Sequence, residues 1–214
     1  MLVLHHLGKS QSERIVWLLE ELGLPYELVH HTRDATTMLS PPALQALHPL
    51  GAAPVIVDDG LMLAESGAIV QYLLGRYGGD SRLAPAPDHP DFAPYLYWFH
   101  FANGNLQAHM GRNMMLKRLD LPADDPVLVS ARGRLDRALR LMDDRLAASP
   151  FLAGQALTAA DIMTVFTLTT MRYFYPLDLA PYPAIRAYLQ RIGSLDSYRR
   201  AMAKGDPGMP LLLD

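Results

Sequence analysis

The spacing of apolar residues changes near residue 80, and this change limits the folds that the chain can adopt. Up to residue 78, short apolar runs typical of strands alternate with longer runs of helical period. Their order predicts a strand, a helix and a strand, followed by a hairpin and a further helix. Beyond residue 91 the periodic segments predict helices. We therefore expect a small α/β domain joined to a larger all-α domain.

The predicted domain limits follow from the same pattern. Residues 1–78 form the α/β domain and residues 91–214 the helical domain. Residues 79–90, GDSRLAPAPDHP, lack a periodic pattern and are rich in breakers, which favours a linker. The predicted helices of the second domain span about 91–118, 126–148, 159–172, 183–193 and 195–204.

Composition excludes several classes of protein. The chain has 214 residues, of which 50% are hydrophobic and 19% charged, as in globular proteins with a sizeable core. A net charge of -3 without a run of Lys or Arg argues against a nucleic-acid surface. The sequence shows neither a membrane-spanning stretch nor a signal-peptide pattern, so we expect a cytoplasmic protein. Without cysteine, any thiol chemistry needs a thiol supplied by a ligand.

A proline stands where a strand is predicted to start, in the sequence GAAPVIV. An X-Pro bond adopts the cis form at a cost of only about 0.5–1 kcal/mol. A cis Pro54 leaves the backbone N–H and C=O of Ala53 available to an extended, peptide-like ligand. The alternative is that Pro54 merely begins an edge strand.

Glu65 and Ser66 open the helix that follows the predicted hairpin. A serine at a helix N-terminus offers a carboxylate its hydroxyl, a backbone N–H and the positive end of the helix dipole. Glu65 offers the opposite charge to an ammonium group. The pair therefore indicates a ligand with an amino-acid terminus, such as a γ-glutamyl group, and simple helix capping is the alternative.

Two other motifs are predicted to carry no chemistry. The pairs His5–His6 and His30–His31 invite comparison with metal sites, but neighbours on a strand point to opposite faces, so we expect no metal. In LTAADI, Thr158 can cap the backbone N–H of Asp161 while Asp161 reaches back. Such a cap contributes about 1 kcal/mol, and we assign it a role in folding.

Taken together, several segments resemble the cytosolic glutathione transferases. They are SERIVWLLEELGLPYELV, HPLGAAPVIVDDG, LAESGAIVQYLLGRY, YLYWFHFANGNL and FLAGQALTAADI, and with the linker they cover nearly the whole chain. RDA at 33–35 and HPLG at 48–51 resemble the branch that contains a yeast glutathione transferase and many bacterial relatives. The resemblance implies a thioredoxin-like domain followed by an all-helical domain, usually paired as a homodimer.

The resemblance also assigns ligand-binding residues. Ala53 and Pro54 match the small residue and the cis proline that bind the cysteinyl backbone of glutathione. Glu65 and Ser66 match the residues that hold its γ-glutamyl end. Ala52 replaces a lysine often found in this segment, which removes a contact to the glycyl carboxylate.

The group that activates the thiol is less well defined. Family members place a Ser, Tyr or Cys between the first strand and the first helix, where it hydrogen-bonds the glutathione sulfur. Lowering a thiol pKa by roughly two units from about 8.5 makes thiolate dominant at neutral pH. Ser10 and Ser12 are the hydroxyls available, but the family spacing falls on Lys9. Ser10, Ser12, Lys9 and a backbone N–H therefore stay open as candidates.

An apolar stripe follows the linker and is predicted to be mostly core; it comprises Tyr95, Trp98, Phe99, Phe101 and Met110. The resemblance implies that Gln107 and Met110, at one end of this stripe, contact the electrophile. It also places His100 where some bacterial relatives have a polar residue near glutathione.

The implied activity is a detoxification reaction that adds the thiolate of reduced glutathione, its co-substrate, to a small hydrophobic electrophile. Peroxidase or lyase-type chemistry at the same site is an alternative. A non-catalytic binding or regulatory protein with this fold, and a dimeric scaffold without a glutathione site, are further alternatives. We expect no metal, nucleic-acid or membrane partner.

Overall fold

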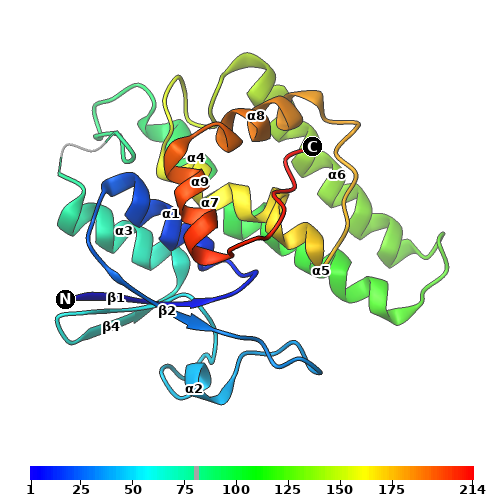
Figure 1. Cartoon of the computed structure of the whole chain (residues 1–214). Helices are drawn as coiled ribbons and strands as arrows, with labels where there is room; N and C mark the ends of the chain where they lie inside the picture. The colour runs from blue at the N-terminus through cyan, green and yellow to red at the C-terminus, as the bar shows by residue number, and fades with distance from the viewer. Residues whose placement is uncertain (80–81) are drawn as a thin grey trace. The chain divides into compact units, whose positions relative to one another are not determined.

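The computed structural model describes residues 1–79 and 82–214, which divide into two compact units (Figure 1). The first consists of Met1–Ser81 with Gly193–Leu211, and the second of Arg82–Ile192 with Leu212–Asp214. The predicted fold class, an α/β part and a helical part, is confirmed. The first unit also includes the last helix of the chain, which the predicted limits assign to the domain at 91–214. Those limits stay a prediction.

The predicted linker at 79–90 contains Asp80 and Ser81, which lie outside the described residues. Residues 82–90 form turns and irregular backbone. Among the described residues, no helix combines the length and the apolar character needed to cross a membrane.

The first unit is built on a four-stranded sheet with the strand order β2-β1-β3-β4. The strands are β1 (Leu2–Leu7), β2 (Glu27–His31), β3 (Val55–Asp58) and β4 (Leu61–Ala64). β2 runs parallel to β1, whereas β3 is antiparallel to both β1 and β4. The helices are α1 (Glu13–Leu22), α2 (Pro42–Gln45), α3 (Ser66–Tyr77) and α9 (Asp196–Gly205). The predicted strand–helix–strand unit and the hairpin are confirmed, with the short helix α2 added between them.

Two turns of the first unit depend on positive φ angles. Gly23 ends α1 at φ 64° and donates its N–H to the carbonyl of Leu19, as expected for a glycine after a helix. In the hairpin, Asp59 and Gly60 have φ 48° and 90°. A type I′ turn requires positive φ at both central residues, so the Asp-Gly sequence explains why the chain reverses here.

The sheet is covered on both faces, with α2 on one side and α1 and α3 on the other (Figure 1). Leu44 of α2 is fully buried in a cluster with Leu7 and Val55. The alternate residues Leu4 and Ile56 are also fully buried, as expected when successive strand residues face opposite layers. The helix α9 packs along α1, where the Trp17 indole N–H donates to the Ser197 hydroxyl at 3.3 Å.

The second unit consists of helices. They are α4 (Phe92–Phe101), the π-helix η1 (Ala102–Gln107), α5 (Ala108–Leu116), the 3₁₀-helix η2 (Lys117–Leu119), α6 (Pro126–Ala148), α7 (Ala159–Leu168), the 3₁₀-helix η3 (Thr170–Tyr173) and α8 (Pro183–Gly193). The predicted helical run at about 91–118 is confirmed as a continuous stretch of helical residues, although the π-helix η1 divides it into α4 and α5. The segment ANGNLQ contains Gly104 between two asparagines, all poor helix formers, which explains why the regular hydrogen-bond ladder yields there.

The capping box predicted in LTAADI is confirmed at the start of α7. The Thr158 backbone N–H donates to Asp161 Oδ2 at 2.9 Å, and the Tyr188 hydroxyl donates to Oδ1 at 3.1 Å. The Leu152 backbone N–H donates to the same Oδ1 at 3.0 Å. Asp161 is fully buried and accepts hydrogen bonds on both oxygens, so it anchors the loop before α7 as well as the helix itself.

Candidate functional site

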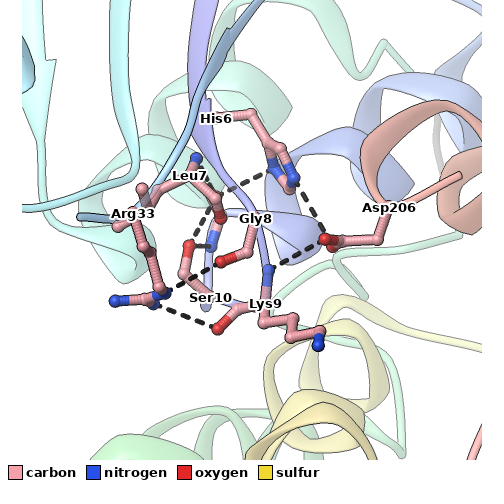
Figure 2. A network of polar contacts seen from close by, with 8 residues as sticks. His6, Leu7, Gly8, Lys9, Ser10, Arg33 and Asp206 are labelled. Atoms are coloured by element: carbon pink, nitrogen blue, oxygen red, sulfur yellow. Dashed lines mark hydrogen bonds and ion pairs between the residues drawn. The ribbon is translucent and has the colours of Figure 1, made fainter. Parts of the chain in front are cut away.

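The turn between β1 and α1 carries the candidate thiol-activating residues. Lys9 adopts a left-handed conformation with φ 52°, which is uncommon for a non-glycine residue. Arg33 braces the turn, because its guanidinium donates to the carbonyls of Gly8 and Lys9, each at 3.1 Å (Figure 2). On the opposite side, the Lys9 backbone N–H donates to Asp206 Oδ1 at 2.9 Å. The strained backbone is therefore fixed from two directions.

The two serine hydroxyls of this turn contact each other, with 2.7 Å between their Oγ atoms. The Ser12 backbone N–H also donates to Ser10 Oγ at 3.2 Å. Ser12 Oγ lies 2.9 Å from His6 Nδ1 and accepts the Leu7 backbone N–H at 3.2 Å. Ser12 is fully buried, whereas Ser10 keeps 7% of its surface. Of the two hydroxyls, Ser10 is the better placed to meet a ligand.

The predicted cis bond is present between Ala53 and Pro54. Both residues are buried and precede β3, whose pairing with β1 and β4 begins at Val55. Ala53 packs in the same apolar cluster as Leu7 and Ala64. Since Leu7 leads into the turn at Gly8 and Ala64 leads into Glu65, this cluster brings three candidate segments to one end of the sheet.

Glu65 and Ser66 form a tight strand-to-helix connection. Glu65 has φ 71° and ψ 111°, a costly conformation for a residue with a side chain, and it is exposed. The helix α3 begins at Ser66, which is 2% exposed. The Ser66 hydroxyl accepts a hydrogen bond from Arg14 Nη1 at 3.2 Å.

Arg14 contacts Ser66 of the Glu65–Ser66 segment, and the sequence did not identify it as a candidate. It is 1% exposed, and its Nη1 also donates to Gln11 Oε1 at 3.0 Å. Desolvation lowers its pKa to about 9, although the carboxylates of Glu13 and Glu65 oppose that change. A buried guanidinium beside a helix N-terminus is well suited to a carboxylate ligand. The only signal for it in the sequence was its position in the first turn of α1, where an arginine is ordinarily a solvated residue.

The remaining candidates lie in the helical unit. His100 is exposed on α4, and Gln107 is half-buried at the end of η1. Met110 is 1% exposed in α5, so its side chain belongs to the core of this unit. The rest of the predicted stripe is buried as well, at Tyr95, Trp98, Phe99 and Phe101. The ligand contacts assigned to His100, Gln107 and Met110 stay predictions.

The histidine pairs behave as the strand alternation predicts. His6 is fully buried and His5 is partly exposed, so neighbours in sequence face opposite layers. Across the strands, His5 Nδ1 lies 3.1 Å from His31 Nε2. Within the described part of the chain, no group of three or more His, Cys, Asp or Glu side chains converges on a point that could hold a metal ion.

Comparison with known proteins gives a consistent result. Two family models described as the glutathione S-transferase N-terminal and C-terminal domains match residues 4–81 and 125–191. Glutathione S-transferase 3 of Schizosaccharomyces pombe is 32% identical over 219 residues, covering 95% of this chain and 88% of the relative. A disulfide-bond oxidoreductase of Escherichia coli is 29% identical over 219 residues, covering 97% of both. The crystal structure of a glutathione S-transferase from Actinobacillus pleuropneumoniae has a TM-score of 0.87 at 35% identity, covering 96% of this chain and 93% of that one.

Proposed function

Because the chain belongs to the glutathione S-transferase family, we propose that it binds reduced glutathione, stabilises its thiolate and adds the sulfur to a small hydrophobic electrophile. The γ-glutamyl end binds at Glu65 and Ser66. The cysteinyl backbone pairs with the backbone of Ala53 beside Pro54, and Ser10 hydrogen-bonds the sulfur.

One observation carries this proposal. The turn after Leu7, the Ala53–Pro54 bond and the Glu65–Ser66 connection all meet at the cluster of Leu7, Ala53 and Ala64. Arg14 links two of them, since it lies in α1 and donates to Ser66. A carboxylate, a peptide backbone and a thiol are the groups that these three segments suit, and glutathione carries them in one extended molecule.

Ser66 offers a direct test of the binding step. In Ser66→Ala, glutathione affinity falls by about 1–3 kcal/mol, because a hydrogen bond to a charged carboxylate is lost. Calorimetric titration with reduced glutathione measures the effect, with one site per chain expected for the unmodified protein. Ser130→Ala, on the exposed face of α6, is the matched control. An unchanged affinity in Ser66→Ala would remove Ser66 from the site.

Ser10 offers a separate test of thiol activation. Replacing Ser10 with Ala removes the hydrogen bond to the sulfur, so the apparent pKa of the bound thiol rises toward its free value of about 8.5. The pH dependence of kcat/KM, measured with a chromogenic electrophile, reports this pKa. If the profile of the variant matches that of the unmodified protein, Ser12, Lys9 or a backbone N–H takes the role instead.

A second candidate activity uses the same thiolate in a different reaction. The extended similarity to a disulfide-bond oxidoreductase favours glutathione-dependent disulfide exchange. In that reaction the glutathione thiolate attacks a disulfide sulfur and the displaced thiolate leaves, so the protein supplies no cysteine of its own. Parallel assays with an aryl halide, a hydroperoxide and a small disulfide distinguish these activities. A protein that binds glutathione but turns over none of them is a binding or regulatory member of the family.

The family also supports a homodimer in the cytoplasm, and light scattering of the purified protein tests the dimer.

Gln107 and Met110 are proposed to contact the electrophile. Gln107→Trp enlarges the less buried of these two side chains, and it is expected to change KM for bulky electrophiles with little effect on glutathione affinity. An unchanged KM would move the acceptor site elsewhere.

A further inference from the structure

We propose that the buried His6 accepts the thiol proton of glutathione through Ser12 and Ser10, and that Asp206 stabilises the imidazolium so formed. This inference rests on the function proposed above and extends it. It makes His6 and Asp206 positioning residues for the thiolate, because neither is expected to touch glutathione itself.

The four side chains form one continuous polar chain within the first unit. Ser10 Oγ lies 2.7 Å from Ser12 Oγ, and Ser12 Oγ lies 2.9 Å from His6 Nδ1. On the other edge of the imidazole, His6 Nε2 lies 3.5 Å from Asp206 Oδ2 (Figure 2). The chain therefore runs from Ser10, the less buried of the two serines, to the fully buried His6, and it ends on the carboxylate of Asp206.

One arrangement of hydrogens directs this chain toward His6, and the Leu7 carbonyl, 3.3 Å from Ser12 Oγ, is a second acceptor for the Ser12 hydroxyl. Leu7 and Ser12 donate backbone N–H groups to Ser12 Oγ and Ser10 Oγ, respectively. With these oxygens already accepting, the Ser10 hydroxyl can donate to Ser12, and the Ser12 hydroxyl to His6 Nδ1. The proposed step starts from this arrangement, in which His6 Nδ1 accepts a hydrogen bond and Nε2 carries the ring proton toward Asp206.

In the proposed step the S–H bond of glutathione breaks and its proton passes to Ser10 Oγ. The original Ser10 proton moves to Ser12 Oγ, and the original Ser12 proton moves to His6 Nδ1. The sulfur keeps the electron pair as a thiolate, and His6 becomes an imidazolium. Each hydrogen bond of the chain is reversed, so the Ser10 hydroxyl now donates to the thiolate. Proton uptake and thiolate stabilisation are thus the same event.

Two glycines allow Asp206 to come this close to the turn. A Cβ added to Gly8 would lie 3.1 Å from Asp206 Oδ1, and one added to Gly205 would lie 3.2 Å from the His6 ring. Both distances are tighter than ordinary van der Waals contact, so a side chain at either glycine would require Asp206 or His6 to shift. The close packing of the two backbone segments therefore brings His6 and Asp206, which are far apart in sequence, next to each other.

Asp206 has the surroundings of a carboxylate that stays ionised. Burial raises its pKa, but the contacts with His6 and with the Lys9 N–H outweigh that effect and hold the pKa below its ordinary value. Its Oδ2 and His6 Nε2 form no hydrogen bond with any described residue. Each is thus available to tighten toward the other when the imidazole gains a proton.

Other charged or titratable groups also face this chain. From β2, the His30 ring packs edge-on against His6 with 5.5 Å between ring centroids, and His31 also interacts electrostatically with His6. From the turn and the loop after β2, Lys9 and Arg33 interact with Asp206. These groups are cationic or neutral, so Asp206 supplies the negative charge that balances an imidazolium at His6.

The test measures two quantities separately, namely the number of protons released on binding and the amount of thiolate formed. Glutathione binding is measured calorimetrically in buffers of different ionisation enthalpy, which gives the number of protons released. Thiolate is followed in parallel by its ultraviolet absorbance as a function of pH. S-methylglutathione, which has no thiol proton, is the control ligand.

In the unmodified protein we expect thiolate at neutral pH with almost no proton released to the buffer, because His6 retains it. In His6→Gln the apparent pKa of the bound thiol rises by about one unit or more, a tenfold loss of thiolate. In that variant thiolate forms only with release of its proton to the buffer, up to about one proton per site where free glutathione is still protonated. Asp206→Asn, which keeps an acceptor for the Lys9 N–H and avoids the core, shifts the pKa in the same direction. His30→Gln is the matched control for loss of a neighbouring imidazole.

Release of about one proton per thiolate by the unmodified protein would overturn the proposal. An unshifted thiol pKa in both His6→Gln and Asp206→Asn would do the same. Either result leaves the proposed function intact, with Ser10 acting alone. If the unmodified protein fails to bind glutathione, the proposed function falls, and this inference falls with it.

Discussion

Two carboxylates, one in each unit, show how differently a folded chain can use the same group. Asp161 is fully buried and accepts hydrogen bonds from Leu152, Thr158 and Tyr188. Asp206 is largely shielded but receives one backbone hydrogen bond, from Lys9, and its second oxygen faces His6 at 3.5 Å. A carboxylate with every position occupied holds a loop and a helix in place. One with an oxygen left to a titratable ring can respond to a proton.

The largest expected effect follows from removing the fully bonded carboxylate. Asp161→Ala leaves buried donors at Leu152, Thr158 and Tyr188 without their acceptor, so we expect a loss of at least about 3 kcal/mol in the free energy of unfolding. Urea unfolding followed by circular dichroism measures it.

Asp125 supplies the matched control for that experiment. It caps α6 by accepting the N–H groups of Val127 and Leu128, but it is partly exposed, so water can replace it. Asp125→Ala should cost about 1 kcal/mol. Equal losses in the two variants would show that burial and bond number do not set the role of Asp161.

The contrast also separates what the sequence could predict from what it could not. The capping box at Thr158 and Asp161 was predictable, because its partners lie three residues apart and the geometry of a helix start brings them together. The same holds for the Asp59–Gly60 turn and for the Ala53–Pro54 and Glu65–Ser66 segments. In each of them, a few neighbouring residues determine the local backbone conformation.

The chain from Ser10 to Asp206 was not predictable in this way. His6 and Asp206 are 200 positions apart in the 214-residue sequence, and their approach depends on how α9 packs on α1. The contact of Arg14 could not be predicted for a related reason, because its partner Ser66 belongs to a different helix. Periodicity identifies the face of a helix that is buried, but not which side chain it will meet.

A second prediction uses pH to measure how much the charge of Asp206 stabilises the fold. The pKa of Asp206 is lowered in the folded protein, so its ionised form stabilises the fold above the ordinary carboxyl pKa of about 4, and that contribution is lost as pH falls below it. Asp206→Asn should therefore cost about 1 kcal/mol at neutral pH. The difference from the unmodified protein should shrink between pH of about 5 and 3. Unfolding free energies measured across this range test it, and a difference that grows with acidity would contradict it.

The smallest expected effect concerns a third carboxylate, Glu20, which has three side-chain partners. Its side chain is 7% exposed and contacts Lys204 and Arg200 of α9, and it accepts the Tyr26 hydroxyl at 2.9 Å. Lys204 is half-exposed, and Lys204→Met keeps the apolar stem while removing the charge. We expect a loss below about 1 kcal/mol, because Arg200 and Tyr26 still satisfy the carboxylate and a solvated ion pair contributes little. The same urea experiment measures it. A loss in Lys204→Met as large as that in Asp206→Asn would mean that charge alone, rather than the number of remaining donors, decides how a buried carboxylate supports this fold.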